Sequence, residues 1–266
     1  MRDFSAEITP LILTRDEEVN LGRTLAQLTW AKEIVIIDSL SADATVTIAK
    51  AFPNVRVIER PFDDLASQWN FGAAQVKTHW ILGLDADYFL PAAFADELHA
   101  LDPPPTVAYY SSEFTYAMHG HPLRASLYPA RPVLFRRDRV SFYMDGHTHR
   151  ARLDGEGRTL REKIIHDDRK PFSRFVQRQR HYMRDEAVKI RRGEGLNWAG
   201  RIRKLRIVAP FAVLVHTLFV RGLVLDGIPG LQYTWERFVA EAILSIEIMK
   251  PARSSDRPSP TGPSSS

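Results

Sequence analysis

The sequence contains no cysteine, which excludes disulfides, thiolate metal sites and a cysteine nucleophile. Residues 1–7 lack the apolar stretch of a secretory signal, so we expect a cytoplasmic protein. Long apolar runs are also scarce. The run at residues 207–220 is interrupted by Pro210 and His216, and it is shorter than the roughly 20 apolar residues of a membrane-spanning helix. We therefore expect it not to cross a bilayer on its own.

Positive charge is concentrated in the middle of the chain. Residues 131–206 carry 22 Lys and Arg against 10 Asp and Glu, whereas the rest of the chain carries 14 against 22. Such a basic region can meet anionic lipid head groups or phosphorylated substrates, or it can be a solvated helical face. Because no nucleic-acid-binding motif is present, we expect no nucleic acid partner.

The first part of the chain alternates short apolar runs with helical patterns. This alternation predicts an α/β fold with a mostly parallel sheet flanked by helices. Strands are predicted at residues 8–14, 34–37, 55–58, 80–84, 107–111 and 133–135. Helices are predicted where Val19, Leu21, Leu25 and Leu28 share one face, after Asp43 as a helix cap, and at residues 65–76.

Turns that carry carboxylates follow three of these strands, and ligands of open α/β sheets bind at the carboxyl ends of strands. Asp85 and Asp87 stand one residue apart directly after a buried strand. Two carboxylates in such a loop can hold Mg²⁺ or Mn²⁺ and leave coordination sites open for phosphate oxygens. Most Asp-x-Asp triplets only cap or solvate a turn, but this position in the strand order favours a metal site.

Four segments, in this order, resemble family 2 glycosyltransferases of the GT-A fold, especially the lipopolysaccharide-core glucosyltransferase type. They are Thr14-Arg15-Asp16-Glu17-Glu18, Ile36-Ile37-Asp38-Ser39-Leu40-Ser41-Ala42-Asp43-Ala44-Thr45, Gln68-Trp69-Asn70 and Trp80-Ile81-Leu82-Gly83-Leu84-Asp85-Ala86-Asp87. Looser similarity continues through residues 160–168 and 221–250. The resemblance implies a Rossmann-like GT-A sheet and an inverting, metal-dependent transfer from a nucleotide diphosphate sugar, with a UDP sugar favoured. The implied acceptor is a saccharide or a lipid-linked saccharide of the cell envelope.

The resemblance also implies roles for individual residues. Thr14, Glu17 and Asp38 are expected near the nucleotide, and Asp85 and Asp87 on the ribose and the metal. A carboxylate at a strand end, such as Asp38, can accept hydrogen bonds from a base or a ribose, although it can also cap a turn. Glu17 has a plainer alternative as a charge near a helix N-terminus. The side chains of Gln68 and Asn70 can bind the donor or fix a loop.

An inverting displacement needs a general base near the acceptor hydroxyl. We nominate Asp145, with His147 in reserve and Asp168 as a weaker option. Relatives often carry a His-Glu pair near residues 149–150, whereas this chain has Arg150, which cannot accept a proton. His149 and His166 are candidates for phosphate or metal contacts because imidazole ligates divalent ions; of these, His149 is our prediction for the metal.

The C-terminal region is predicted to be helical and apolar. A basic amphipathic helix is expected at residues 173–192, an apolar run at 207–220 after Arg201, Arg203, Lys204 and Arg206, and a last helix through Trp235 and Ile246. We divide the chain into a GT-A domain at 1–170, a helical extension at 171–250 and a disordered tail at 251–266. The extension can pack as core, form a homodimer or lie on a membrane. We favour peripheral contact with the inner face of the plasma membrane.

Two alternative functions remain open from the sequence. A sugar nucleotidyltransferase has a similar architecture and metal, but it normally opens with a Gly-rich phosphate loop, which this chain lacks after its first strand. A non-catalytic, membrane-associated protein of the same fold is compatible with Arg150 at the place of the expected acid.

Overall fold

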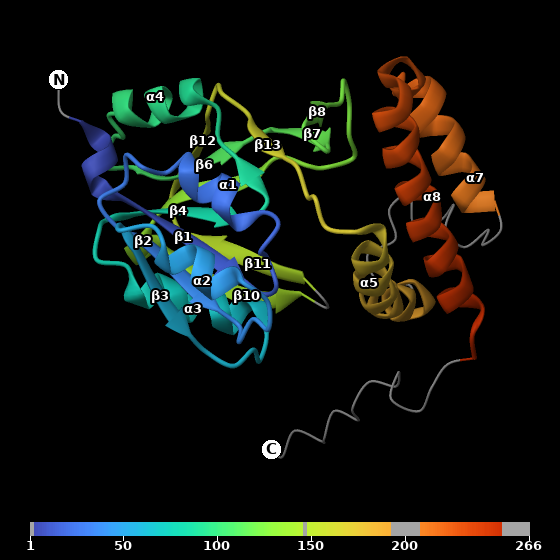
Figure 1. Cartoon of the computed structure of the whole chain (residues 1–266), viewed down its shortest axis with the longest axis horizontal. Coiled ribbons are helices and arrows are strands. Elements are labelled where there is room, and N and C mark those ends of the chain that lie inside the picture. Colours follow the sequence, from blue (N-terminus) through green and yellow to red (C-terminus); the bar gives the residue numbers. More distant parts are fainter. Residues whose placement is uncertain (1–2, 146–147, 193–207, 252–266) are drawn as a thin grey trace, which may run out of the picture.

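The computed structural model describes residues 3–145, 148–192 and 208–251. Figure 1 shows an α/β part around a twisted sheet, with the helices α5, α7 and α8 standing together on one side of it. The predicted tail, apart from residue 251, and the predicted base His147 lie outside the described residues, as do residues 193–207. The predicted boundary at residue 170 falls in the connection between the last strand and α5.

Within these ranges the central sheet has seven strands in the order β12-β6-β9-β4-β1-β2-β3. The strands are β1 (Ile8–Thr14), β2 (Ile34–Asp38), β3 (Val55–Glu59), β4 (Trp80–Asp85), β6 (Val107–Ser112), β9 (Arg131–Arg136) and β12 (Glu156–Thr159). β4, β1, β2 and β3 run parallel, and β9 is antiparallel to its neighbours β4 and β6. The predicted α/β fold with a mostly parallel GT-A sheet is confirmed.

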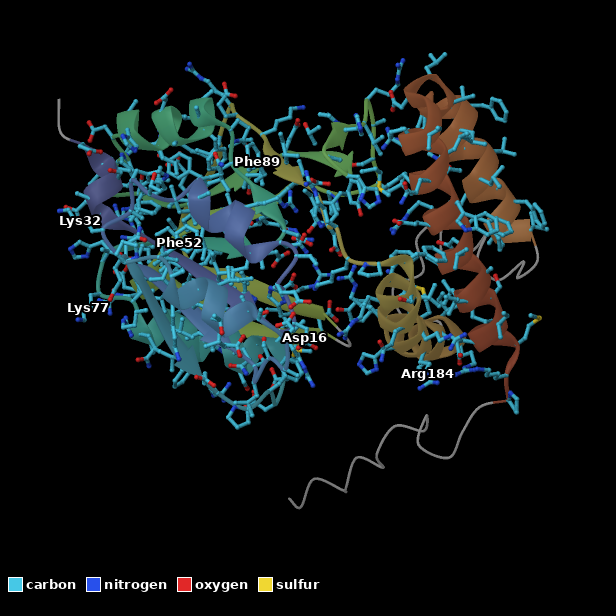
Figure 2. The ribbon with its side chains drawn as sticks, in the orientation of Figure 1. Asp16, Lys32, Phe52, Lys77, Phe89 and Arg184 are labelled. Carbon is cyan, nitrogen blue, oxygen red and sulfur yellow. The ribbon has the colours of Figure 1, made fainter. Side chains whose placement is uncertain are left out.

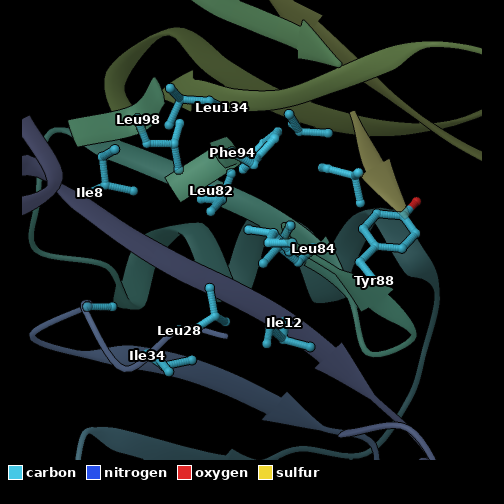
Figure 3. Close-up of a cluster of buried hydrophobic side chains, with 14 of the residues drawn as sticks. Ile8, Ile12, Leu28, Ile34, Leu82, Leu84, Tyr88, Phe94, Leu98 and Leu134 are labelled. Atoms are coloured by element: carbon cyan, nitrogen blue, oxygen red, sulfur yellow. The ribbon is translucent and has the colours of Figure 1, made fainter. Parts of the chain in front are cut away.

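Apolar side chains cover both faces of this sheet. Because successive side chains of a strand point to opposite faces, Ile12 packs in one buried cluster and Leu11 in another. Figure 3 shows the first cluster, in which strand residues such as Leu82 pack beside Phe94. The helices of this part are α1 (Leu21–Ala26), α2 (Thr45–Lys50), α3 (Leu65–Gln75) and α4 (Ala92–Ala100).

Two local expectations need correction. Val19 does not share the buried face of the first helix, because α1 begins only at Leu21 and the Val19 side chain is exposed. The residue that precedes α2 is Ala44, not Asp43. Asp43 still satisfies a free backbone donor, since its carboxylate accepts a hydrogen bond from the Thr45 N–H at 3.0 Å.

Short strands that the sequence pattern did not reveal complete the α/β part. Among the described residues, a four-stranded sheet has the order β5-β13-β7-β8, and β10 pairs with β11. Their bounds are β5 (Tyr88–Phe89), β7 (Phe114–Met118), β8 (His121–Pro122), β10 (Val140–Asp145), β11 (Thr148–Leu153) and β13 (Ile164–His166). The pairing of β13 with β5 sets His166 opposite Tyr88, beside the Asp85–Asp87 turn.

The C-terminal helices pack on one another and on the edge of the smaller sheet. They are α5 (Phe172–Arg192), α7 (Val208–Val215) with its π-helical continuation η3 (His216–Val220), the 3₁₀ turn η4 (Leu223–Asp226) and α8 (Gly227–Met249). α8 runs along α5 and α7 and also meets β7. The expected basic helix is therefore present as α5, and the apolar run is helical from Val208 onward.

The face of α8 that carries Trp235 and Ile246 was expected to be buried, but α8 buries a different face. Tyr233, Leu244 and Ile248 are buried, whereas Trp235 is 52% exposed and Ile246 53% exposed. In the described part of the chain, no single helix has the length and apolar content to cross a membrane. The pair formed by residues 208–220 and 223–249 passes such a test only together, across a 70° bend.

Candidate active site

The carboxyl ends of β1 and β2 are joined by a buried aspartate. Asp38 accepts hydrogen bonds from Thr14 Oγ1 at 2.7 Å, from Ser41 Oγ at 2.6 Å and from the Ser41 N–H at 2.8 Å. The structure thus brings together Thr14 and Asp38, which the sequence predicted at the nucleotide. A nucleoside that hydrogen-bonds to Asp38 must share or replace one of these donors, because the carboxylate is completely buried.

Glu17 lies on the loop after β1, close to the predicted metal-binding turn. Its carboxylate pairs with Lys170 and accepts a hydrogen bond from Asn20 Nδ2 at 3.1 Å. Burial raises the pKa of Glu17 to about 7; the positive charge of Lys170 opposes this shift, and the charge of Asp87 adds to it. Glu17 therefore interacts electrostatically with Asp87 in the turn formed by residues 85–87, which we call the aspartate turn. Such an interaction is expected for a residue of the same site.

The loop after β1 also touches the helical extension. Asp16, labelled in Figure 2, lies 3.5 Å from a guanidinium nitrogen of Arg174 on α5. Its backbone adopts a left-handed conformation with φ of 52°, which an aspartate tolerates better than most residues. The loop is thus held between the sheet and α5.

Asp85 is the open member of the aspartate pair. It ends β4, and its side chain is 47% exposed. The nearest guanidinium nitrogen of Arg131, on β9, lies 3.9 Å from its carboxylate. Arg131 also stacks over the Tyr128 ring at 4.6 Å from the ring centre. A fixed positive charge therefore stands beside an accessible carboxylate, which suits a phosphate-bearing ligand.

Asp87 is buried and faces an imidazole. His166 Nε2 lies 3.2 Å from Asp87 Oδ2. Burial favours the neutral form of Asp87, but His166 outweighs this effect, and the pKa of Asp87 is lowered to about 2. Burial likewise opposes the charged form of His166, and the charge of Asp87 raises its pKa. The second carboxylate oxygen, Oδ1, is buried and has no hydrogen-bond partner among the residues that the structure describes.

The structure favours His166 over His149 as the imidazole of the site. The His149 ring stacks on Trp69 and lies against Phe142, with ring centres 5.8 and 5.9 Å apart. Burial lowers the pKa of His149, and among the described residues no hydrogen bond or ion pair joins it to Asp85 or Asp87. His149 remains our sequence-based prediction for the metal. From the sequence both histidines are candidates and we select His149, because the pairing of β13 with β5, which places His166 beside Asp87, has no readable sequence pattern.

A buried amide that sequence reasoning missed links the site to α5. Asn20 Nδ2 donates to Asp168 Oδ1 at 3.1 Å as well as to Glu17. Arg178 of α5 pairs with the other oxygen of Asp168 at 2.9 Å. Both Asp168 oxygens therefore have partners, an arrangement that holds α5 against the loop after β1. Asn20 has no motif around it, and its partner lies far away in the sequence.

Gln68 and Asn70 fix neighbouring segments. Gln68 accepts a hydrogen bond from Arg60 at 2.8 Å and donates to the Pro61 carbonyl at 3.1 Å. Asn70 exchanges two hydrogen bonds with the backbone of Phe142 on β10, at 2.8 and 2.9 Å. The loop-fixing alternative describes both residues here, and a contact with the donor stays a prediction.

The predicted base Asp145 ends β10, where its carboxylate pairs with Arg150 of β11 at 2.5 Å. This hairpin therefore places an acid and the unexpected arginine together, and the side chains of both are accessible to solvent. His147 lies outside the described residues. Within those residues, no three His, Asp or Glu side chains are arranged so that they could hold a metal ion together.

Comparisons with known proteins cover the α/β part best. The family model described as "Glycosyl transferase family 2" matches residues 11–154. A protein of Rickettsia bellii, described as an uncharacterized glycosyltransferase, is 31% identical over 96 residues, which are 36% of this chain and 32% of that protein. The lipopolysaccharide core biosynthesis glycosyltransferase LpsC of Rhizobium meliloti is 30% identical over 98 residues, 35% of this chain and 36% of LpsC. The chain thus matches about a third of the length of these curated relatives.

Two solved structures match this chain at low sequence identity and with low TM-scores. S. aureus TarS in complex with UDP-GlcNAc is 15% identical, with a TM-score of 0.43 and 90% of each chain covered. The glucosyl-3-phosphoglycerate synthase of Mycobacterium tuberculosis, in complex with Mn²⁺, UDP and phosphoglyceric acid, is 14% identical. Its TM-score is 0.44, and 63% of this chain and 72% of that chain are covered.

Proposed function

This chain belongs to glycosyl transferase family 2, and we propose that it transfers a sugar from a nucleotide diphosphate sugar, preferably a UDP sugar, to a saccharide or lipid-linked acceptor. The transfer inverts the configuration at the anomeric carbon. The observation that carries this proposal is the register of the sheet, which sets Thr14 beside Asp38 and Leu13 beside Asp85. The nucleotide residues and the aspartate turn therefore share one edge. The similarity to LpsC supports a role in cell-envelope synthesis.

The side chains at this edge can bind both the nucleoside and the diphosphate of a nucleotide diphosphate sugar. Asp38 and Thr14 offer hydrogen-bonding groups for the base or the ribose. Arg131 lies beside Asp85, where its guanidinium can bind a diphosphate oxygen. Stabilising the negative charge that develops on the leaving diphosphate lowers the barrier to transfer.

The residues present fit a divalent cation, Mg²⁺ or Mn²⁺. Asp85 offers an accessible carboxylate. Asp87 offers a buried oxygen that has no hydrogen-bond partner within the described part of the chain, and a cation would satisfy it. Asp85 and Asp87 would hold the ion, with His149 as the predicted imidazole ligand. His166, which stands beside Asp87, would position that carboxylate. When bound, the cation neutralises the charge of the departing diphosphate.

A thermal-shift screen with UDP, GDP and dTDP, each with and without Mn²⁺, tests the proposed function. We expect UDP with Mn²⁺ to raise the melting temperature most, since a ligand at a hundredfold its dissociation constant adds about 2.7 kcal/mol to the free energy of unfolding. The Asp87→Asn variant should lose the Mn²⁺-dependent part of the shift. The control Asp138→Asn, on the turn before β10, should keep it. No shift of the wild-type protein with any nucleotide would overturn the proposal.

We also propose that the protein attaches peripherally to the inner face of the plasma membrane. Exposed apolar side chains gather on α7, η3, η4 and the first half of α8. We call them the apolar hairpin surface: Val208, Phe211, Val215, Phe219, Val220, Val224, Leu225, Ile228, Leu231 and Trp235. A large exposed apolar patch marks a site for a membrane or another protein. α5, which packs on α8, carries the half-exposed side chains of Arg174 and Arg184, and positive charge on this group of helices suits anionic head groups.

Co-sedimentation with vesicles tests the attachment. We expect the wild-type chain to sediment with phosphatidylcholine vesicles that contain phosphatidylglycerol. A variant with Phe219→Ser and Ile228→Ser should remain in the supernatant, because both side chains are exposed and contribute apolar area. Phe62→Ser, which removes an exposed phenylalanine from the α/β part, should sediment like the wild type. A stable dimer that ignores vesicles would show that a second copy covers this surface instead.

A further inference from the structure

α8 carries an acidic residue on its buried face, where apolar side chains are expected. Glu236 is only 8% exposed, and among the described residues no hydrogen bond or ion pair satisfies its carboxylate. A buried carboxylate without a partner costs folding free energy, so such groups are rare unless they have a use. The carboxylate lies outside the segment that the family model matches.

The surroundings of Glu236 come from several elements. Charged and titratable groups that act on it, or on which it acts, are Arg237 of the same helix, Asp168, Arg178 of α5, and Tyr116 and Tyr233. Burial raises the pKa of Glu236 to about 7; Arg237 opposes the shift, and the negative charge of Asp168 adds to it. Arg237 is not a tight partner, since its guanidinium lies over the rings of Phe175 and Tyr233 at 5.5 and 5.3 Å.

A chain of ring contacts connects this position to the aspartate turn. The ring centre of Tyr233, one turn before Glu236 on α8, lies 4.9 Å from that of Tyr116 on β7. The Tyr116 ring lies 4.8 Å from the His166 ring, which contacts Asp87. Residues three apart on a helix share a face, so Glu236 points to the same side as Tyr233. Tyr116, which lies beside His166, and Asp168, two residues after His166, both interact electrostatically with Glu236. Glu236 therefore lies close to the aspartate turn.

We propose that Glu236 is the catalytic residue that accepts the proton of the acceptor hydroxyl, an inference that rests on the proposed glycosyl transfer. The acceptor oxygen forms a bond to the anomeric carbon while the bond from that carbon to the diphosphate oxygen breaks. The bonding electron pair leaves with the nucleoside diphosphate. The hydroxyl proton passes to the Glu236 carboxylate, which later releases it to solvent.

The other carboxylates near the site are less available for this step. Asp145 is paired with Arg150 on the β10–β11 hairpin. Asp168 has partners on both oxygens, and Glu17 is paired with Lys170. A general base works best when its pKa lies near the working pH and its carboxylate is free to take a proton, and Glu236 meets both conditions.

Donor hydrolysis, in which water takes the place of the acceptor, tests the proposal on the full-length chain. UDP-glucose, UDP-galactose and UDP-GlcNAc are incubated with Mn²⁺, and release of UDP is followed between pH 5.5 and 9. The wild-type rate should rise with pH through about 7, where Glu236 loses its proton. Glu236→Gln should lower the rate about 100-fold or more and abolish this pH dependence. Glu236→Asp should restore part of both.

Three comparisons make the result decisive. UDP with Mn²⁺ should raise the melting temperature of Glu236→Gln as much as that of the wild type, which shows that the donor site is intact. Glu241→Gln, on the same helix, should keep the wild-type rate. If Asp145→Asn abolishes hydrolysis and Glu236→Gln does not, the proposal is wrong and Asp145 is the base. If the wild type fails to bind any nucleotide, the proposed function itself is wrong.

Discussion

Two buried glutamates, Glu17 and Glu236, have raised pKa values. Glu17 is fixed by Lys170 and Asn20, whereas Glu236 has no such partner among the described residues. Burial is the main cause of the shift in both cases. This difference in partners implies different roles for the two residues. Glu17, which is paired, contributes negative charge to the site, whereas Glu236, which is unpaired, is free to exchange a proton.

The pH dependence of stability should reveal the unpaired carboxyl. Its pKa rises from 4.5 to about 7 on folding, so ionisation disfavours the folded state. The resulting loss of stability is absent below pH 4.5, develops as the pH rises and is complete above about 7. Glu236→Gln removes it and should raise the free energy of unfolding at pH 8 by up to about 3 kcal/mol, with little change at pH 4.5. Urea denaturation at both pH values measures this; destabilisation at pH 8 would contradict it.

Sequence patterns predict a residue's place when the residue follows a recognisable strand. Thr14, Asp38 and Asp85 each end a predicted strand, and the structure gathers them at one edge of the sheet. His166 and Glu236 lack such a guide. His166 reaches Asp87 only because β13 pairs with the two-residue strand β5, and a strand of that length has no readable pattern.

At the scale of elements, one amide joins α3 to β10. Asn70 makes both of its hydrogen bonds to the backbone of Phe142. Asn70→Ala should lower the free energy of unfolding by about 1–3 kcal/mol, because it leaves both backbone groups without this partner. Asn70→Asp keeps the acceptor for the Phe142 N–H and should cost less. Urea denaturation measures both variants, and equal effects of the two would show that the donated hydrogen bond carries all of the stability.

The close approach of α3 to the sheet makes a second prediction at this scale. A Cβ atom at Gly72 would lie 2.8 Å from Leu11 Cδ1 and 3.1 Å from Ile37 Cγ1. Gly72→Ala should therefore destabilise the protein by about 1–3 kcal/mol through overpacking. Gly22→Ala in α1 meets only Ile48 Cγ2 at 3.5 Å and should be neutral or stabilise by up to about 1 kcal/mol. Thermal melts compare the two variants, and a lower melting temperature for Gly22→Ala alone would contradict this account.

The strands of the parallel sheet could be predicted from the sequence, whereas the buried face of α8 could not. The strands of the parallel sheet are continuous apolar runs because both of their faces are covered. In α8, apolar residues occur around the whole helix, so periodicity does not reveal which side packs on α5 and β7. The outward position of Trp235 depends on contacts between segments far apart in the sequence.

At the scale of the whole molecule, a tryptophan reports on the apolar hairpin surface. Trp235 is half exposed, whereas Trp69 and Trp80 are buried. Vesicles containing phosphatidylglycerol should shift the fluorescence of the protein to shorter wavelengths, because Trp235 moves from water into the bilayer interface. Trp235→Phe should remove most of this shift while the protein still sediments with the vesicles. An unchanged shift in this variant would place the membrane contact elsewhere.

The seam between the family-matched α/β part and α8 has an evolutionary consequence. Thr14 and Asp38, which we propose bind the nucleotide, come from the matched segment, and Glu236 comes from a helix beyond it. The two sides touch through side-chain contacts such as Tyr116 with Tyr233, and in the described ranges no strand pairing joins them. Under the proposed function, recombination at this seam replaces the helix that carries the proposed base and keeps the proposed donor residues.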